Sequence, residues 1–392
     1  MAELDLKLKT LLGNHIETAL GYLGGNLSEA RKKSIEYYLG DKLGTEIDGR
    51  SQVVSTDVSD TIESILPNLL RIFTASDKVV KCEPVTAEDV PLAEQATAYL
   101  NHVFYKDNDG FQLLYNFFKD ALIEKNGFLK VYWDESETVE FETYQNLSKA
   151  DKDSLNDTKD EIEIVEEEEF EDETAREKYE KLLEQYEAQG VDISKIEEPN
   201  FSLYNCKIKR TKKHGKIKIE SVPPEEFLID RNAKTIQDAD FVSHKVLMSR
   251  SDLVAMGYDE EEVKNLPASS DDIYNTEDMV RQRNVDEYPV DNYTQGQNTK
   301  VLIYESYVRY DQDEDGIAEL RKIVSAGDNG STILENMPCD NIPFVTITPI
   351  PMPHRFYGRS VSELVEDIQL MKSTVMRQLL DNMYLTNNNR VA

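Results

Sequence analysis

The sequence contains few residues of the kinds that build covalent or metal-based frameworks. Its three cysteines, Cys82, Cys206 and Cys339, are far apart and odd in number. This argues against a disulfide framework or a zinc knuckle and favours a reducing compartment. None of the five histidines lies at metal-binding spacing from a partner, so a catalytic or zinc site built from them is not predicted. They are His15, His102, His214, His244 and His354.

Long apolar runs and excess positive charge are also missing. No run of 18 apolar residues occurs, and the start of the chain has no apolar export segment, so neither a transmembrane helix nor a signal peptide is predicted. Lys and Arg number 44 against 76 Asp and Glu, a formal net charge of −32. Proteins that grip nucleic acid carry basic surfaces, so tight binding is not predicted, whereas an acidic wall would let a duplex slide.

What is present predicts a folded chain of the α+β class. Apolar residues make up 39% of the 392 residues, enough for two or three domains with hydrophobic cores. Tyrosine outnumbers phenylalanine 20 to 13, and tyrosine suits half-buried surfaces and interfaces. Pattern and charge divide the chain into five regions: helical 1–133, an acidic insertion with one amphipathic helix at 134–200, mixed helix and strand at 201–300, a β-hairpin region at 301–350, and a long helix within 351–392.

Apolar spacing of three and four residues predicts the individual helices. We expect Pro67 to kink or split the first of them, because proline cannot donate the helical hydrogen bond. Ser251 is the expected N-cap of a short helix that ends at Gly257. The predicted helices cover residues 55–73, 92–105, 110–125, 251–256 and 360–384, and the predicted strands cover 128–133, 216–219, 227–229, 301–310 and 317–325.

The acidic insertion stands out by its charge. Residues 134–198 contain 25 acidic and 7 basic residues, a local net charge of −18, and the run Glu166 to Glu169 should be solvated. One helical face is nevertheless apolar, formed by Ala175, Tyr179, Leu182, Leu183 and Tyr186. A basic patch follows at 207–218 around an expected His214-Gly215 turn. It could contact phosphate, pair with the acidic insertion, or simply solvate a hairpin, and we favour the last two.

The end of the chain has the clearest local pattern. Ser360 and Glu363 form a capping box, serine at the cap and glutamate three residues on. One apolar helical face follows: Val361, Leu364, Val365, Ile368, Met371, Val375, Leu379 and Met383. The preceding Gly358-Arg-Ser-Val lacks the second glycine of a nucleophile elbow and the lysine of a phosphate loop.

The sharpest candidate site is an aspartate-rich turn with Asp311, Asp313, Asp315 and Glu319. Three aspartates at alternate positions followed by glycine match the start of a calcium loop. The twelfth position should be glutamate but is Lys322, and the flanks predict strands, so this is no EF-hand. We favour an acidic hairpin turn over a Ca²⁺ or Mg²⁺ site. Two rival functions depend on this cluster: a calcium-binding structural or adhesion module, and a metal-dependent nuclease.

Several segments, in the same order, resemble the portal proteins of short-tailed, podovirus-like bacteriophages. Each is weak alone, but together they cover nearly the whole chain. The segments are Arg31-Lys-Lys-Ser-Ile-Glu-Tyr-Tyr-Leu39, Gly49-Arg-Ser-Gln-Val-Val54, Phe118 to Trp133, Val222-Pro-Pro-Glu-Glu-Phe227, Asp252-Leu-Val-Ala-Met-Gly-Tyr258, and Pro353-His-Arg-Phe-Tyr-Gly-Arg-Ser360 with the helix that carries Gln369, Arg377, Leu380, Asp381 and Tyr384.

The resemblance implies a structural, non-enzymatic subunit of a ring of about twelve copies at the capsid vertex, assembled in the host cytoplasm and present in the virion. It implies wing, stem, clip and crown regions around a channel for DNA packaging and ejection, with the last helix near the stem and the Asp311 hairpin as one candidate for the clip. Implied partners are the terminase motor, scaffold and coat proteins, a tail adaptor, and double-stranded DNA bound without sequence preference; no cofactor and no membrane are implied. Relatives continue beyond such a helix, so we expect a chain that ends at Ala392 to be incomplete.

Overall fold

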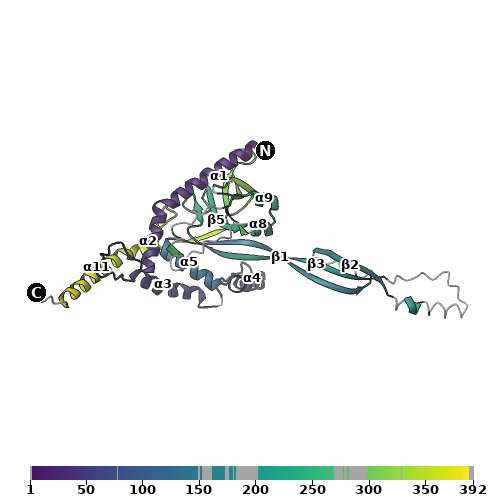
Figure 1. Ribbon diagram of the computed structural model, residues 1–392, viewed down its shortest axis with the longest axis horizontal. Helices are drawn as coiled ribbons and strands as arrows, with labels where there is room; N and C mark the ends of the chain where they lie inside the picture. Colours follow the sequence, from purple (N-terminus) through teal and green to yellow (C-terminus); the bar gives the residue numbers. More distant parts are fainter. Residues whose placement is uncertain are drawn as a thin grey trace. The chain divides into compact units, whose positions relative to one another are not determined.

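The computed structural model combines helices with antiparallel sheets, as expected for the α+β class (Figure 1). It describes residues 2–76, 78–148, 151, 161–172, 176–179, 181, 202–268, 277, 280–281, 298–327 and 329–387. These form two compact units. Unit 1 consists of residues 1–132 and 218–392, and unit 2 of residues 133–217.

A five-stranded sheet is the first layer of unit 1. Its order is β4-β5-β6-β7-β8, with all neighbours antiparallel. The strands are Phe227–Ile229 (β4), Phe241–Ser249 (β5), Lys300–Tyr310 (β6), Glu319–Ala326 (β7) and Thr332–Pro338 (β8). Because β5 pairs with β6 along nine residues, one sheet crosses the boundary that the sequence suggested at residue 300.

Helix α1 (Ala2–Tyr22) covers this sheet (Figure 1). Its buried side chains recur at steps of three and four residues, which places them on one helical face. They pack with apolar side chains of β4 to β7 in one core cluster: Leu8, Leu12, Ile16 and Ala19 against Leu228, Phe241, Leu302, Tyr304, Val308 and Ile323. Two short helices, α8 (Arg250–Ala255) and α9 (Glu260–Asn265), follow β5 and belong to a smaller core cluster with β6 and β7.

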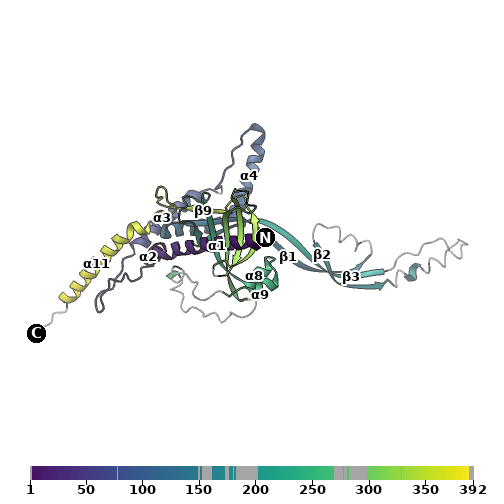
Figure 2. The same cartoon turned by 90° about the horizontal axis from the view of Figure 1, so that it is seen from above.

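A helical layer forms the rest of unit 1. Helices α2 (Ser28–Leu39), α3 (Asp57–Thr74) and α5 (Gly110–Glu124) share one apolar core, which includes Ile62, Leu66 and Phe118. The start of β1 (Gly127–Leu147) pairs with β9 (Phe344–Ile347) beside this core. Helix α4 (Val90–His102) projects from the other helices (Figure 2). Helix α11 (Ser362–Asn387) is the last element that the structure describes.

Unit 2 is a sheet in which a basic strand lies between two acidic ones. The central β3 (Ser202–Val222) has β2 (Glu161–Glu171) on one side and β1 on the other. The basic patch of β3 pairs with the acidic strands, as one sequence interpretation held. The ion pairs are Lys207–Glu166, Lys209–Glu163, Arg210–Glu142 and Lys212–Glu140, at 2.6 to 3.5 Å. Among the described residues of unit 2, Cys206 and Ile208 are buried apolar ones, and the other side chains are exposed or half-buried.

The expected amphipathic helix of the insertion falls largely outside the described residues. Leu182, Leu183 and Tyr186 are not described, and residues 176–179 are helical. The glutamate run 166–169 is solvated as predicted, but it lies in strand β2, which sequence analysis missed. Alternation is lost within this run because glutamates occupy both faces of the strand there. Cross-strand ion pairs stabilise β2, together with the pairing of Ile164 opposite the buried Ile208.

Three local predictions were wrong, each for a steric or hydrogen-bonding reason. Of the two outcomes expected at Pro67, splitting of α3 was wrong, because Pro67 lies on the exposed face, where water can bind the carbonyl that loses its partner. Gly215 makes no turn but continues β3, where a Cβ atom would lie 2.1 Å from the Trp133 ring. Ser249, not Ser251, caps α8, in a capping box with Asp252. The predicted terminator Gly257 has φ +97°, which confirms its role.

A buried ionic cluster joins the helical layer to the segment before β4. Arg281 forms ion pairs with three carboxylates: Glu124 at 2.5 Å, Glu225 at 2.9 Å and Asp120 at 3.9 Å. Arg31 is fully buried, donates to the Glu124 and Pro224 carbonyl oxygens, and lies over the ring of Tyr357. Burial raises the pKa of Glu124 to about 8, despite the attraction of Arg281. Glu225 adds repulsion and is itself raised in pKa by burial.

This cluster predicts a stability that falls as pH rises. The folded-state pKa of Glu124 lies above its ordinary value, so between about pH 5 and pH 8 the folded state binds the proton more tightly than the unfolded state. Deprotonation therefore lowers the free energy of unfolding. Glu124→Gln stays neutral and should flatten this slope in urea unfolding at several pH values, whereas Glu17→Gln on an exposed face of α1 should not. Parallel pH profiles for both variants would contradict this role for Glu124.

Candidate functional site

Helix α11 packs on unit 1 through its polar face. Ser362, Gln369, Ser373 and Arg377 are buried, whereas the predicted apolar face is mainly exposed. The exposed fractions of Leu364, Ile368, Met371, Val375, Leu379 and Met383 lie between 47% and 63%. The earlier Val361 and Val365 are half-buried against the helical core. An α-helix normally buries its apolar stripe, so the orientation of α11 in the single chain is unusual.

The side chains of this polar face bind backbone groups of other segments. We call the four residues Gln369, Ser373, Arg377 and Asp381 the polar ladder. Gln369 accepts from the Val58 N–H at 2.8 Å and donates to the Tyr37 carbonyl at 3.0 Å. Ser373 Oγ accepts from the Ser55 N–H at 3.0 Å. About two turns later, the Asp381 carboxylate accepts from the Ser51 N–H at 2.8 Å. Ser373 and Asp381 thus bind N–H groups of an irregular segment, 45–56, that would otherwise need water, whereas Gln369 binds backbone groups of α2 and α3.

Arg377 forms more bonds than the other residues of this polar ladder. Its guanidinium donates to the Val53 carbonyl at 2.8 Å, to Thr45 Oγ1 at 2.9 Å and to Glu46 Oε1 at 2.5 Å. The side chains of Arg377 and Glu46 are each 7% exposed. Burial alone would raise the pKa of Glu46, but backbone N–H donors and the Arg377 charge outweigh it and hold the pKa below its ordinary value. This buried ion pair, together with the bonds from the same guanidinium to Val53 and Thr45, fixes geometry as well as contributing energy.

The aspartate-rich turn joins β6 to β7, and the structure brings three of its four predicted residues together. Ligand atoms of Asp311, Asp313 and Asp315 lie within 4.8 Å of one another. Glu319 lies instead on β7 and pairs with Arg321 at 3.2 Å. Both Asp311 oxygens already accept backbone N–H groups, from Asp315 at 3.1 Å and Gly316 at 2.8 Å. The cation site stays a prediction, and these hydrogen bonds support the hairpin-turn interpretation.

Sequence analysis named the apolar stripe of α11 but missed its polar ladder. A signal was present, because Gln369, Ser373, Arg377 and Asp381 recur every four residues on one helical face. Polar residues at that spacing normally face water, so nothing in the pattern alone marks them as buried.

The comparisons with known proteins agree with this structural character. A family model described as phage SU10 portal protein matches residues 8–392. The protein is therefore of the portal class, structural components of phage heads that form an oligomeric ring at a capsid vertex. Within that class, the chain belongs to the phage SU10 portal protein family. No curated protein matches the chain. Among the described residues, no helix combines the length and apolar character needed to cross a membrane.

The ladder predicts unequal effects for two cations on α11. Arg377→Ala leaves Glu46 buried without its charge partner and should lower the free energy of unfolding by about 2 to 4 kcal/mol. Lys372→Ala removes an exposed ion pair with Asp57 and should cost less than about 1 kcal/mol. Urea unfolding of both variants measures the difference. Equal losses would show that the ladder does not hold α11.

The turn predicts a stronger response to mutation than to calcium. Asp311→Ala removes the carboxylate that accepts the Asp315 and Gly316 N–H groups and should lower the free energy of unfolding by about 1 kcal/mol. Asp313→Ala is the matched control, because Asp313 accepts one long bond of 3.4 Å from the Asp315 N–H. Thermal melting with and without millimolar Ca²⁺ separates the two interpretations. A large rise in melting temperature with Ca²⁺, lost in Asp311→Ala, would establish a cation site.

Proposed function

We propose that this chain is the subunit of a ring, about twelve copies around, that forms the channel for double-stranded DNA during packaging and ejection. The observation that carries the proposal is the exposed apolar stripe of α11, held outward by the buried polar ladder. Large exposed apolar patches on soluble proteins mark interaction surfaces. In a ring, the stripe would pack on the neighbouring copy and become buried.

Rigid positioning of the stripe supports an obligate contact between copies. The ladder fixes the rotation of α11, so its apolar side chains face away from the chain that carries them. Obligate subunit interfaces are more apolar than transient ones and resemble the interior of a domain. A cyclic ring uses one stripe and one complementary surface per copy, which leaves no stripe exposed after closure.

The charge balance suits a conduit for DNA. Each lysine or arginine on a phosphate releases counterions and adds retention, whereas acidic or neutral walls do not. A net charge of −32 makes such a lining available. Movement of DNA would be driven by the terminase motor, and scaffold, coat and tail adaptor proteins would contact the outer surfaces of the ring. Assembly would take place in the host cytoplasm and the ring would remain in the virion.

The proposal predicts that charge on the stripe blocks ring formation. Leu379→Glu places a carboxylate in the expected contact and should leave monomers, whereas Gln378→Glu adds the same charge at an exposed neighbouring position and should assemble like the parent. Electron microscopy for rings with a central hole, with light scattering for mass, measures assembly. Rings formed equally well by Leu379→Glu would place the subunit contact elsewhere, and a parent that stays monomeric at high concentration with capsid components present would refute the ring.

A further inference from the structure

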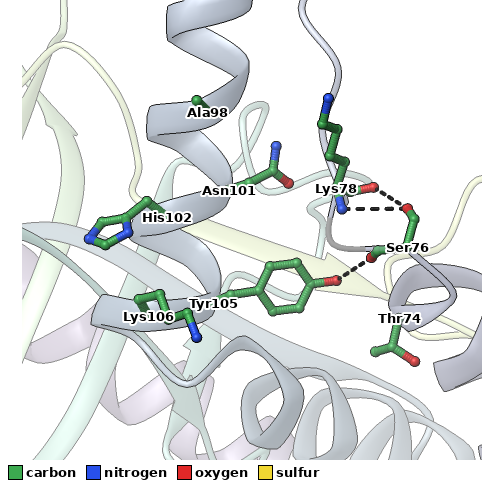
Figure 3. A pocket seen from close by; sticks show the side chains of 8 residues that line it. All are labelled: Thr74, Ser76, Lys78, Ala98, Asn101, His102, Tyr105 and Lys106. Carbon is green, nitrogen blue, oxygen red and sulfur yellow. Dashed lines mark hydrogen bonds between the residues drawn. The ribbon is translucent and has the colours of Figure 1, made fainter.

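A pocket of about 590 Å³ lies between α4 and the chain that follows α3, apart from α11 and the aspartate-rich turn (Figure 3). Its lining residues come from two segments of unit 1. They are Thr74, Ser76, Lys78, Ala98, Asn101, His102, Tyr105 and Lys106. Among these described residues are two lysines and a histidine but no carboxylate, in a chain where acidic residues outnumber Lys and Arg 76 to 44.

The wall of the pocket is fixed by buried polar side chains of α4. Asn101 Oδ1 accepts from the Val79 N–H at 2.6 Å, and its amide donates to the Val80 carbonyl at 2.8 Å. Thr97 Oγ1 accepts from the Cys82 N–H at 2.9 Å. Asn101 and Thr97 are 7% and 5% exposed. An extended segment is thus attached to the helix without help from a ligand, and a preformed site loses little entropy when it binds.

The remaining polar groups of the pocket are already engaged. Tyr105, on the short helix η3 (Val103–Asp107), donates to the Phe73 carbonyl at 2.8 Å and points toward Ser76. Ser76 Oγ donates to the Lys78 carbonyl at 3.0 Å, and Thr74 Oγ1 donates to the Leu70 carbonyl at 2.9 Å. The neutral side chains therefore build the frame, and the charged groups remain to meet a ligand.

Lys78 and Lys106 provide those charges. Both side chains are exposed, and neither forms an ion pair with any residue that the structure describes. They lie on opposite sides of Tyr105 in Figure 3. His102 is at the edge, points away from Tyr105, and approaches Asp107 at 3.6 Å. The two ammonium groups thus set the charge that a ligand would have to match.

We propose that this pocket binds phosphate groups, with Lys78 and Lys106 as the recognising residues. Lysine is a common phosphate binder that acts as a compact point charge. Two lysines match the charge of one phosphate dianion or of two adjacent phosphodiesters, and exceed that of one carboxylate. The volume accommodates more than a bare phosphate, so the group can belong to a larger molecule. The assignment does not depend on ring formation.

Isothermal titration of the purified chain with inorganic phosphate tests the assignment. The parent should bind phosphate more tightly than acetate, and Lys78→Ala with Lys106→Ala should weaken phosphate binding at least about tenfold. Lys9→Ala with Lys234→Ala changes the net charge equally at exposed positions that do not line the pocket, and should bind like the parent. Lys78→Arg with Lys106→Arg should also retain binding, because both charges remain.

Further arms identify the source of the phosphate. A short DNA duplex that competes with inorganic phosphate in the parent, but not in the double alanine variant, would assign the pocket to nucleic acid. Competition by a mononucleotide but not by the duplex would assign it to a small molecule. The proposal is overturned if the parent does not bind phosphate, if acetate binds as tightly, or if both double alanine variants bind equally.

Discussion

The hydrogen bonds between α11 and the segment 45–56 determine which face of α11 is exposed to other molecules. A helix with one apolar and one polar face would ordinarily bury the apolar face, which gains free energy simply by leaving water. Here Ser373, Arg377 and Asp381 form specific bonds with backbone groups of this segment that also need partners. The polar face satisfies the segment, and the apolar stripe remains outward. The ring proposal depends on this orientation, since a reversed helix would have no apolar surface to share.

Charge is organised at short range in both units, despite the large negative total. In unit 2 the basic strand β3 lies between acidic strands, and cross-strand ion pairs add to a small apolar contribution from Cys206 and Ile208. In unit 1 burial is the main reason why the pKa of Glu124 is raised, and repulsion from Glu225 and Asp120 adds to it. The pocket near α4 is a third arrangement, in which Lys78 and Lys106 have no described carboxylate partner. The net charge of the chain therefore predicts none of these three local charge environments.

Local sequence patterns predicted the elements whose stability is local. The capping box of α11 is formed as expected, with Glu363 N–H donating to Ser360 Oγ at 3.1 Å. The helix before Gly127 and the strand at 227–229 also match their predictions. Prediction failed where distant residues decide the outcome. Gly215 looked like a turn residue, but it is needed for the close approach of Trp133, more than eighty positions earlier.

From the sequence alone, the class of fold, the family resemblance, the apolar stripe of α11 and the aspartates of one turn could be identified, because each is a property of neighbouring residues. Tertiary structure decided which face of α11 is buried and that Glu319 lies apart from the three aspartates. It also decided that Lys78 and Lys106 line one pocket. These outcomes depend on contacts between segments far apart in the chain, such as Arg377 with Glu46. Periodicity records which side chains share a face, but only packing determines what that face meets.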